Sequence, residues 1–359
     1  MKRFLLILLA LGLLAAGGME WFIAAWDSPG PATSEKVVLI PPRTPLHQTV
    51  EKLGEAGAVN FTLMFELELR VRGIASQVKA GEYAIPAHAS MRAIADILVA
   101  GKSIQHKLTA AEGLTSEMIW KLVKADPVLV GDAGPVPAEG TLLPETYLFT
   151  RGMTRSKLLN EMAEAQVKFL DQHWPGRAAD LPFQTERQAV TLASIVEKEV
   201  ALPEERRHVA QVFINRLKQG MRLQSDPTIV YGLTRGYPLG HGIRQSELTG
   251  ATPYNTYVID GLPPTPIANP GKDALLAVLN PPPGNDLYFV ADGKGKSLFA
   301  ATVADHARNV VAFRAAERLL NPPQRVLDAP QLELTVPTDD IGANMPKLPV
   351  LAKKPARRR

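Results

Sequence analysis

The chain of 359 residues contains no cysteine. This absence excludes a disulfide scaffold, a thiolate nucleophile, a cysteine-ligated zinc or iron–sulfur site and an N-terminal lipoprotein cysteine. It does not exclude work outside the cytoplasm, because a chain of this length buries a core that needs no disulfide. The length itself favours two or three domains.

The chain has only a small excess of positive charge, with 40 Lys and Arg against 36 Asp and Glu, a net charge of +4. Most of that excess lies in residues 321–359, so the rest of the chain is nearly neutral. A neutral body argues against a nucleic-acid partner. The hydrophobic fraction of 46% argues against wholesale disorder.

Several familiar catalytic motifs are also missing. The sequence contains no G-x-S-x-G elbow, no P-loop and no H-E-x-x-H, and none of the seven histidines pair at metal-ligand spacing on a clear helix. A serine triad or a zinc hydrolase therefore has no sequence support, although triads assemble in space rather than in sequence. We expect no metal.

A long apolar run stands at the N-terminus. Lys2 and Arg3 precede residues 4–26, which are apolar except for Glu20. As a helix this stretch spans about 30 Å of hydrocarbon, and the preceding positive charges orient it with its start in the cytoplasm. We predict a single-pass helix over residues 1–26, with the rest on the outer (periplasmic) face of the cytoplasmic membrane. The alternative is a cleaved signal peptide, which also implies export.

The composition divides the remaining chain into four segments. Residues 27–36 are a linker rich in Pro and Gly, and residues 321–359 are a Pro-rich basic tail that we expect to be disordered. Residues 37–101 predict a strand, two helices, a second strand and a third helix, an order that resembles a LysM-like glycan-binding module. A generic α/β spacer is the alternative.

Residues 102–320 form the larger predicted domain. Helical patterns cover residues 116–125, 156–173, 188–202, 204–219 and 304–319, with a strand-like stretch over 139–147 and loops and short strands over 221–299. Strands and helices do not alternate regularly, so the fold class is α+β rather than a doubly wound sheet.

One helical run carries two candidate acids. Residues 193–199 read Ala-Ser-Ile-Val-Glu-Lys-Glu, and the wheel places Glu199 with Leu192, Ile195 and Val196, slightly favouring it over Glu197 as the sunken carboxylate. Burial against hydrocarbon raises the pKa of such an acid, so that it can protonate a leaving oxygen near neutral pH. Periodicity alone favours an ordinary surface glutamate.

Two later loops are rich in polar and aromatic groups. Residues 220–228 combine an amide, a hydroxyl, a carboxylate and a guanidinium, and residues 254–257 read Tyr-Asn-Thr-Tyr. Tyrosines with amide and hydroxyl groups suit a sugar cleft, since glycans present apolar ring faces and many hydroxyls. Turn chemistry is the alternative explanation.

Taken together, these segments resemble the endolytic murein transglycosylase family. The resemblance covers roughly residues 4–319 and rests on six segments in the same order and spacing, at 193–199, 212–217, 220–228, 254–257, 261–264 and 287–293. It implies a single-pass membrane anchor, a LysM-like subdomain and a catalytic domain that faces the cell wall, and it implies no cofactor.

The resemblance also assigns roles to residues. It makes Glu199 the catalytic glutamate and Glu197 the fallback, and it leaves Asp226 and Glu145 as possible second acids. The segment 139–147 would line the cleft, although Leu142 and Leu143 stand where aromatics are more usual. The expected sugar-binding residues are Gln224, Asp226, Tyr254, Asn255, Glu139 and Tyr147. Asp305 and His306 also match a family position.

The function implied is cleavage of the glycan strand between N-acetylmuramic acid and N-acetylglucosamine. An internal hydroxyl attack leaves a 1,6-anhydro end, and such cleavage would terminate nascent strands beside penicillin-binding glycan synthases. Two alternatives stay open: a non-catalytic peptidoglycan-binding membrane scaffold, and a muramidase-type hydrolase.

Overall fold

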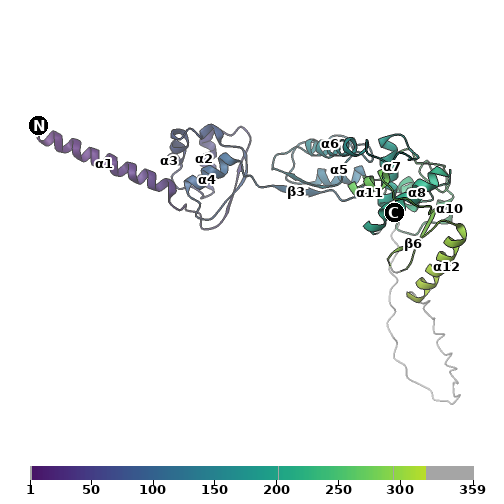
Figure 1. Ribbon diagram of the computed structural model, residues 1–359. Coiled ribbons are helices and arrows are strands. Elements are labelled where there is room, and N and C mark those ends of the chain that lie inside the picture. Colours follow the sequence, from purple (N-terminus) through teal and green to yellow (C-terminus); the bar gives the residue numbers. More distant parts are fainter. Residues whose placement is uncertain (1, 201, 294, 321–359) are drawn as a thin grey trace, which may run out of the picture.

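The computed structural model describes residues 2–200, 202–293 and 295–320 (Figure 1). Within these residues, helices are joined by three antiparallel sheets of two strands each. The predicted α+β class is therefore confirmed. The predicted disordered tail, residues 321–359, lies outside the described residues.

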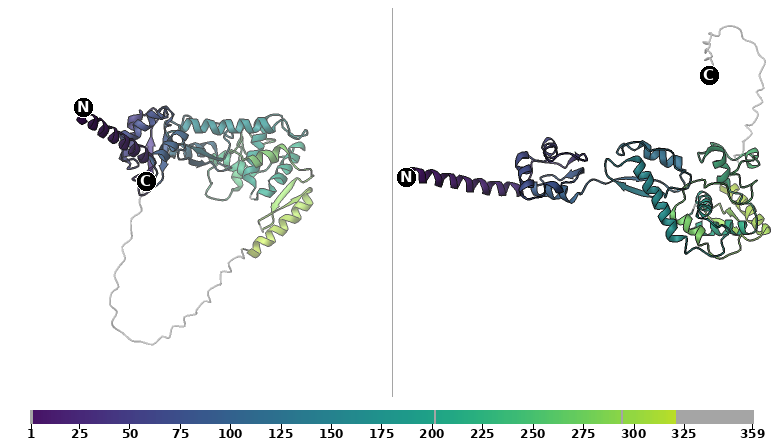
Figure 2. Two further views of the ribbon diagram at one scale, coloured as in Figure 1. Left: turned by 60° about the vertical axis from the view of Figure 1, so that its left-hand side comes forward. Right: turned by 90° about the horizontal axis from the view of Figure 1, so that it is seen from above.

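The segment that we predicted as a membrane anchor forms the first helix, α1 (Lys2–Asp27). Among the described residues, no helix is both long and apolar enough to cross a lipid bilayer. Trp26, the last residue of the apolar run, is 1% exposed and stacks on Phe65. The guanidinium of Arg72 lies 4.8 Å above the Trp26 ring. The last turn of α1 thus belongs to a protein core, and the rest of the helix projects away from it (Figures 1 and 2).

The small domain follows the predicted order of elements. It contains β1 (Lys36–Ile40), α2 (Leu46–Glu55), α3 (Thr62–Val71), a 3-10 turn (Ala75–Gln77), β2 (Gly81–Ile85) and α4 (Met91–Ala100). Strands β1 and β2 pair antiparallel, and the helices bury Leu53, Leu69 and Ile94 against them. Local signals fix α4: the Ser90 hydroxyl accepts from the N–H of Ala93, and Gly101 ends the helix in the left-handed conformation.

A partly buried ion cluster connects this domain to the next one. The Glu82 carboxylate on β2 lies 2.5 Å from Nε2 of His106, the first residue of β3, and 2.9 Å from Nε of Arg151. The Arg151 guanidinium and His106 hold the pKa of Glu82 below its usual value, against the opposing effect of burial. Besides these contacts, one extended segment joins the two parts (Figures 1 and 2).

The first half of the larger domain is built from β3 (His106–Thr109), α5 (Ser116–Ala125), β4 (Thr146–Phe149) and α6 (Arg155–His173). Residues such as Ile119, Leu142 and Met162 form its core. The strand-like prediction over 139–147 is wrong for most of its length, because β4 begins only at Thr146. The backbone before it bends inward, where Leu143 N–H donates to the carbonyl of Met162 on α6.

The second half contains the helices that carry the candidate acids. They are α7 (Glu186–Glu199), a 3-10 turn (Pro203–Glu205), α8 (Arg206–Lys218), α9 (Asp226–Thr234), α10 (Gln245–Leu248) and α11 (Lys272–Leu279). Helices α7, α8 and α11 pack together through Ile195, Phe213 and Leu275. The prediction of loops and short strands over 221–299 missed α9, α10 and α11.

A hairpin and a terminal helix complete the fold. Strands β5 (Tyr288–Ala291) and β6 (Ser297–Ala300) pair antiparallel, and α12 (Val303–Leu320) packs on both of them. The hairpin is held to α8 by aromatic contacts: Phe289 meets Phe213 edge-on, and Phe299 stacks on His208. This packing places the hairpin over the C-terminal end of α7.

Gly140 provides a test of the packing around the bend before β4. Its φ is 75°, and an added Cβ would lie 2.5 Å from Cγ of Pro266. We expect Gly140→Ala to lower the free energy of unfolding by about 3 kcal/mol, because left-handed strain and overpacking add. Gly134→Ala, at a φ of 70° with nothing within 4 Å, should cost only about 1 kcal/mol. Urea denaturation measures both, and equal losses would contradict the clash.

Candidate active site

Helix α7 carries the two candidate acids at the end of a buried segment. The helix begins with a capping box in which Thr185 and Gln188 satisfy each other's backbone N–H. The eight residues from 189 to 196 are all buried, and the chain turns extended at Val200. Glu197 and Glu199 are two residues apart, which separates them by about 200° around the helix axis. They therefore face different surroundings.

Glu197 is fully engaged in holding the helix end. Its side chain is 6% exposed; Oε1 accepts from Arg206 at 3.1 Å and Oε2 accepts from the Gly271 N–H at 3.0 Å. Arg206 also lies near the carboxylates of Glu112 and Asp273. This ion pair joins α7 to α8 and to the start of α11, so Glu197 has a structural role.

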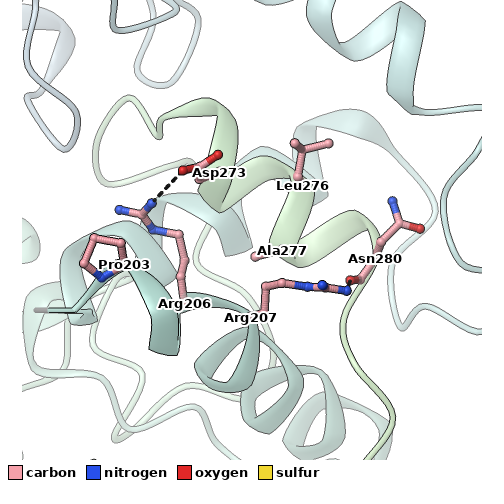
Figure 3. A pocket seen from close by; sticks show the side chains of 7 residues that line it. All are labelled: Pro203, Arg206, Arg207, Asp273, Leu276, Ala277 and Asn280. Carbon is pink, nitrogen blue, oxygen red and sulfur yellow. Dashed lines mark hydrogen bonds and ion pairs between the residues drawn. The ribbon is translucent and has the colours of Figure 1, made fainter. Parts of the chain in front are cut away.

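A pocket of about 390 Å³ lies beside this ion pair (Figure 3). Figure 3 shows Arg206 reaching Asp273, while Arg207 extends toward Asn280, whose carbonyl accepts its hydrogen bond. The remaining lining is largely apolar, from Pro203, Leu276 and Ala277. Because the charged groups of this pocket already pair within the protein, we do not assign the chemistry to it.

Glu199 has different surroundings. Its Oε2 accepts a hydrogen bond of 2.8 Å from the Ser225 hydroxyl, and no cation in the described part of the chain forms an ion pair with it. Burial raises the pKa of Glu199 to about 7, against the lowering effect of the Ser225 hydroxyl; the charge of Asp226 raises it and that of Arg216 lowers it. The C-terminal end of a helix also disfavours a negative charge.

The free side of Glu199 opens to a second pocket, of about 380 Å³. Val200 and Val209 line one wall, and the β5–β6 hairpin lines the other. Glu205 fixes this hairpin, because its carboxylate accepts from both the N–H and the hydroxyl of Ser297. The volume is within the range of small-ligand sites. The Glu199 carboxyl group thus borders a cavity of ligand size.

Two loops form the opposite side of the site. Gln224 has a φ of 52°, and its N–H donates to the carbonyl of Thr256. The Tyr257 hydroxyl donates to Oδ1 of Asp226 at 2.7 Å. Asp226 acts on the pKa of Glu199 through space, and both Asp226 and Gln224 are exposed. Among the predicted residues, the structure therefore gathers Gln224 and Asp226 beside Glu199.

Two predicted sugar-binding residues, Tyr254 and Asn255, form hydrogen bonds within the loops. Asn255 is 1% exposed, and its amide donates to the carbonyls of Glu247, Leu248 and Gly250. The Tyr254 hydroxyl bonds to Thr265, and the ring meets the Tyr231 ring edge-on. Both residues shape the 254–257 loop from behind.

The candidates of segment 139–147 are also used within the protein. The Glu139 carboxylate accepts from the Ser116 N–H and the Tyr231 hydroxyl, and burial raises its pKa. Glu145 pairs with Lys272. The Tyr147 hydroxyl donates to the carbonyl of Leu143.

The last pair of predicted residues lies on α12. The His306 ring stacks on Tyr288, and burial lowers its pKa. At the start of α12, the Asp305 carboxylate accepts from the Thr302 hydroxyl, and the Thr302 hydroxyl oxygen accepts from the Asp305 N–H.

The sequence reasoning missed three contributors to the site: Ser225, Tyr257 and the β5–β6 hairpin. Ser225 and Tyr257 lie inside the polar loops that we had singled out, so their positions gave a signal. Segment 287–293, which contains β5, was part of the family resemblance, but its place over α7 could not be predicted. That place depends on contacts between segments about ninety residues apart, such as that of Glu205 with Ser297.

Comparison with known proteins identifies the class. Residues 38–312 match the model of the YceG-like family, so the chain belongs to this family. It is 31% identical over 356 residues to the "Endolytic murein transglycosylase" of Streptococcus pneumoniae serotype 2 (strain D39 / NCTC 7466), a match that covers 84% of this chain and 63% of that protein. A protein with the same description from Bacillus subtilis (strain 168) is 33% identical over 172 residues, 47% of this chain and 46% of its own.

The chain thus spans less than two thirds of the length of these curated relatives. A solved structure, described as a putative yceG-like protein from Listeria monocytogenes, is 26% identical with a TM-score of 0.47. The match covers 77% of this chain and 98% of that one.

The raised pKa of Glu199 predicts a pH-dependent stability. The folded pKa of about 7 exceeds the usual value of 4.5 for a glutamate, so the favourable contribution of the neutral acid is complete below about pH 4.5 and is lost as the pH rises to about 7. Glu199→Gln should match the wild type near pH 4 and exceed its free energy of unfolding by about 3 kcal/mol near pH 9. Urea denaturation across this range measures it; a constant difference would contradict the buried neutral acid.

Glu197→Gln should lower the free energy of unfolding, whereas Glu199→Gln should raise it above neutral pH. The change leaves the buried Arg206 guanidinium without its nearest carboxylate, while Glu112 and Asp273 remain 3.7 and 3.6 Å away. We expect a loss of about 3 kcal/mol at neutral pH, the low end for breaking a buried ion pair. The same denaturation series measures it, and a variant as stable as the wild type would remove the structural role of Glu197.

Proposed function

We propose that this chain is an endolytic peptidoglycan lytic transglycosylase, a lyase, with Glu199 as its catalytic residue. The observation that carries the proposal is a largely buried carboxyl group with a pKa of about 7, unpaired with any described cation, at the edge of a pocket. The printed descriptions of the curated relatives support the substrate class.

The proposed reaction uses one group twice. Protonated Glu199 donates its proton to the glycosidic oxygen as the bond between N-acetylmuramic acid and N-acetylglucosamine breaks. The resulting carboxylate takes the proton from the muramoyl C6 hydroxyl, whose oxygen bonds to the anomeric carbon and forms the 1,6-anhydro end. A pKa near neutrality suits a group that must be acid and then base. The nucleophile belongs to the same sugar, so no water is consumed.

The other acids have different places in the proposal. Glu197 and Glu145 are engaged with Arg206 and Lys272, so neither is assigned a catalytic role. Asp226, held by the Tyr257 hydroxyl, raises the pKa of Glu199 and presents an exposed carboxylate to the sugars. An exposed second carboxylate also favours a muramidase-type hydrolase as the alternative, since hydrolases use a pair of acids.

The rest of the predicted organisation belongs to the same proposal. We infer that residues 37–101 act as a LysM-like glycan-binding domain and residues 102–320 as the catalytic domain. The β1–α2–α3–β2 order of the small domain supports the first assignment. Gln224, Asp226 and Tyr257 would position the sugars. Action outside the cytoplasm on nascent strands, beside penicillin-binding glycan synthases, would terminate those strands.

Product analysis tests the reaction. We expect the full chain to convert uncrosslinked glycan strands to internal fragments with 1,6-anhydromuramoyl ends, measured by mass spectrometry. Glu199→Gln should lower the rate by about 10³-fold, since it removes the acid and base. Glu161→Gln, a partly exposed glutamate on α6 near Lys157, is the matched control and should cleave normally.

The products separate the alternatives. Reducing ends would replace the lyase by a muramidase. Strand binding with no cleavage by the wild type would favour a non-catalytic peptidoglycan-binding scaffold. Cleavage by Glu199→Gln at the wild-type rate would overturn the assignment of the catalytic residue.

A further inference from the structure

The two carboxylate oxygens of Glu199 are not equivalent. Oε2 accepts the hydrogen bond from the Ser225 hydroxyl at 2.8 Å. Oε1 has no hydrogen-bond partner among residues 2–200, 202–293 and 295–320, and the side chain borders the 380 Å³ pocket. Of the two oxygens, Oε1 is therefore the one left to meet a substrate.

Ser225 is itself rigidly placed. It is 0% exposed, its N–H donates to the Thr256 hydroxyl at 2.9 Å, and its carbonyl accepts from the Thr228 hydroxyl at 2.6 Å. The hydroxyls of Thr228 and Thr256 lie 2.9 Å apart, and both residues are 0% exposed. This set of buried hydroxyls locks the 224–228 loop to the 254–257 loop beneath Glu199.

We propose that Ser225 is a positioning residue, which holds Oε2 of Glu199 so that Oε1 carries the proton to the substrate. This inference rests on the proposed function. A hydroxyl donates a stronger hydrogen bond to a carboxylate than to a neutral acid. Ser225 therefore also stabilises the carboxylate that remains once the proton has left, and lowers the barrier to proton donation.

Two neighbouring donors form hydrogen bonds elsewhere. Arg216 uses its guanidinium on the carbonyls of Leu223 and Leu287, and the Tyr257 hydroxyl is committed to Asp226. The titratable and charged groups that face Glu199 from the packed elements are Arg216 on α8, Asp226 on α9, Tyr257 in the following loop, Glu205 before α8 and Lys296 on the hairpin.

The test compares two buried serines of the same domain. Ser225→Ala removes the donor to Glu199. Ser194→Ala, also 0% exposed, removes a hydroxyl that donates to the carbonyl of Thr191 and accepts from the Ile267 N–H, without contact to Glu199. Both changes cost stability by loss of a buried hydrogen bond. Only the first should alter the acid itself.

Two readouts are made on the full chain. Carbon-13 NMR of glutamate carboxyls, with the Glu199 signal assigned by its loss in Glu199→Gln, should show a higher pKa of Glu199 in Ser225→Ala and no change in Ser194→Ala. Cleavage of glycan strands should slow about 10-fold in kcat with KM nearly unchanged in Ser225→Ala, the effect of one hydrogen bond to a charged group. The alkaline limb of its pH profile should move upward.

The outcomes distinguish this inference from the proposed function. An unchanged pKa of Glu199 in Ser225→Ala, with a folded protein, would overturn the role of Ser225 even if the chain cleaves glycans. A higher pKa of Glu199 in Ser225→Ala, together with a wild type that cleaves no glycan, would keep the role of Ser225 in holding Glu199 and overturn the proposed function. Equal loss of kcat in both serine variants would show a structural effect alone.

Discussion

The burial of Glu199 without a cationic partner is the constraint on which the site depends. A buried carboxylate without a cationic partner is costly, so burial raises the pKa of Glu199 to about 7 and favours the neutral acid below that pH. The buried run of α7 sets this environment, because its position among α8 and α11 leaves only the helix end near solvent. The helix dipole acts in the same direction.

Arg216 shows how the surrounding parts hold that environment together. This one residue of α8 contacts both sides of the site. Its Nε donates to the carbonyl of Leu287 before the hairpin, and Nη1 donates to the carbonyl of Leu223 before the Ser225 loop. Its charge lowers the pKa of Glu199, but less than burial raises it. The same guanidinium thus joins the two walls and moderates the acid without forming an ion pair with it.

Local signals in the sequence predicted what local interactions determine. The hydroxyl cap at Ser90 and the glycine at 101 gave α4, and hydrophobic periodicity gave α6. Helices α9 and α11 have nine and eight residues, too short to be stable alone, and depend on tertiary packing that a sequence pattern does not show. The apolar run that ends at Trp26 shows a similar limit. A tryptophan suits a membrane interface and a protein core equally well, and its contact with Phe65 is visible only in the fold.

The same limit explains the two acids of α7. The helical wheel separated Glu197 from Glu199 only slightly, since both lie on partly apolar faces. Their difference comes from residues elsewhere in the chain: Arg206 and the Gly271 N–H reach Glu197, while Ser225 reaches Glu199. A guanidinium and a backbone N–H stabilise a carboxylate that fastens three helices, whereas a single hydroxyl orients an acid without forcing it to ionise. Two identical side chains, two positions apart, thus acquire a structural and a proposed chemical role from their partners alone.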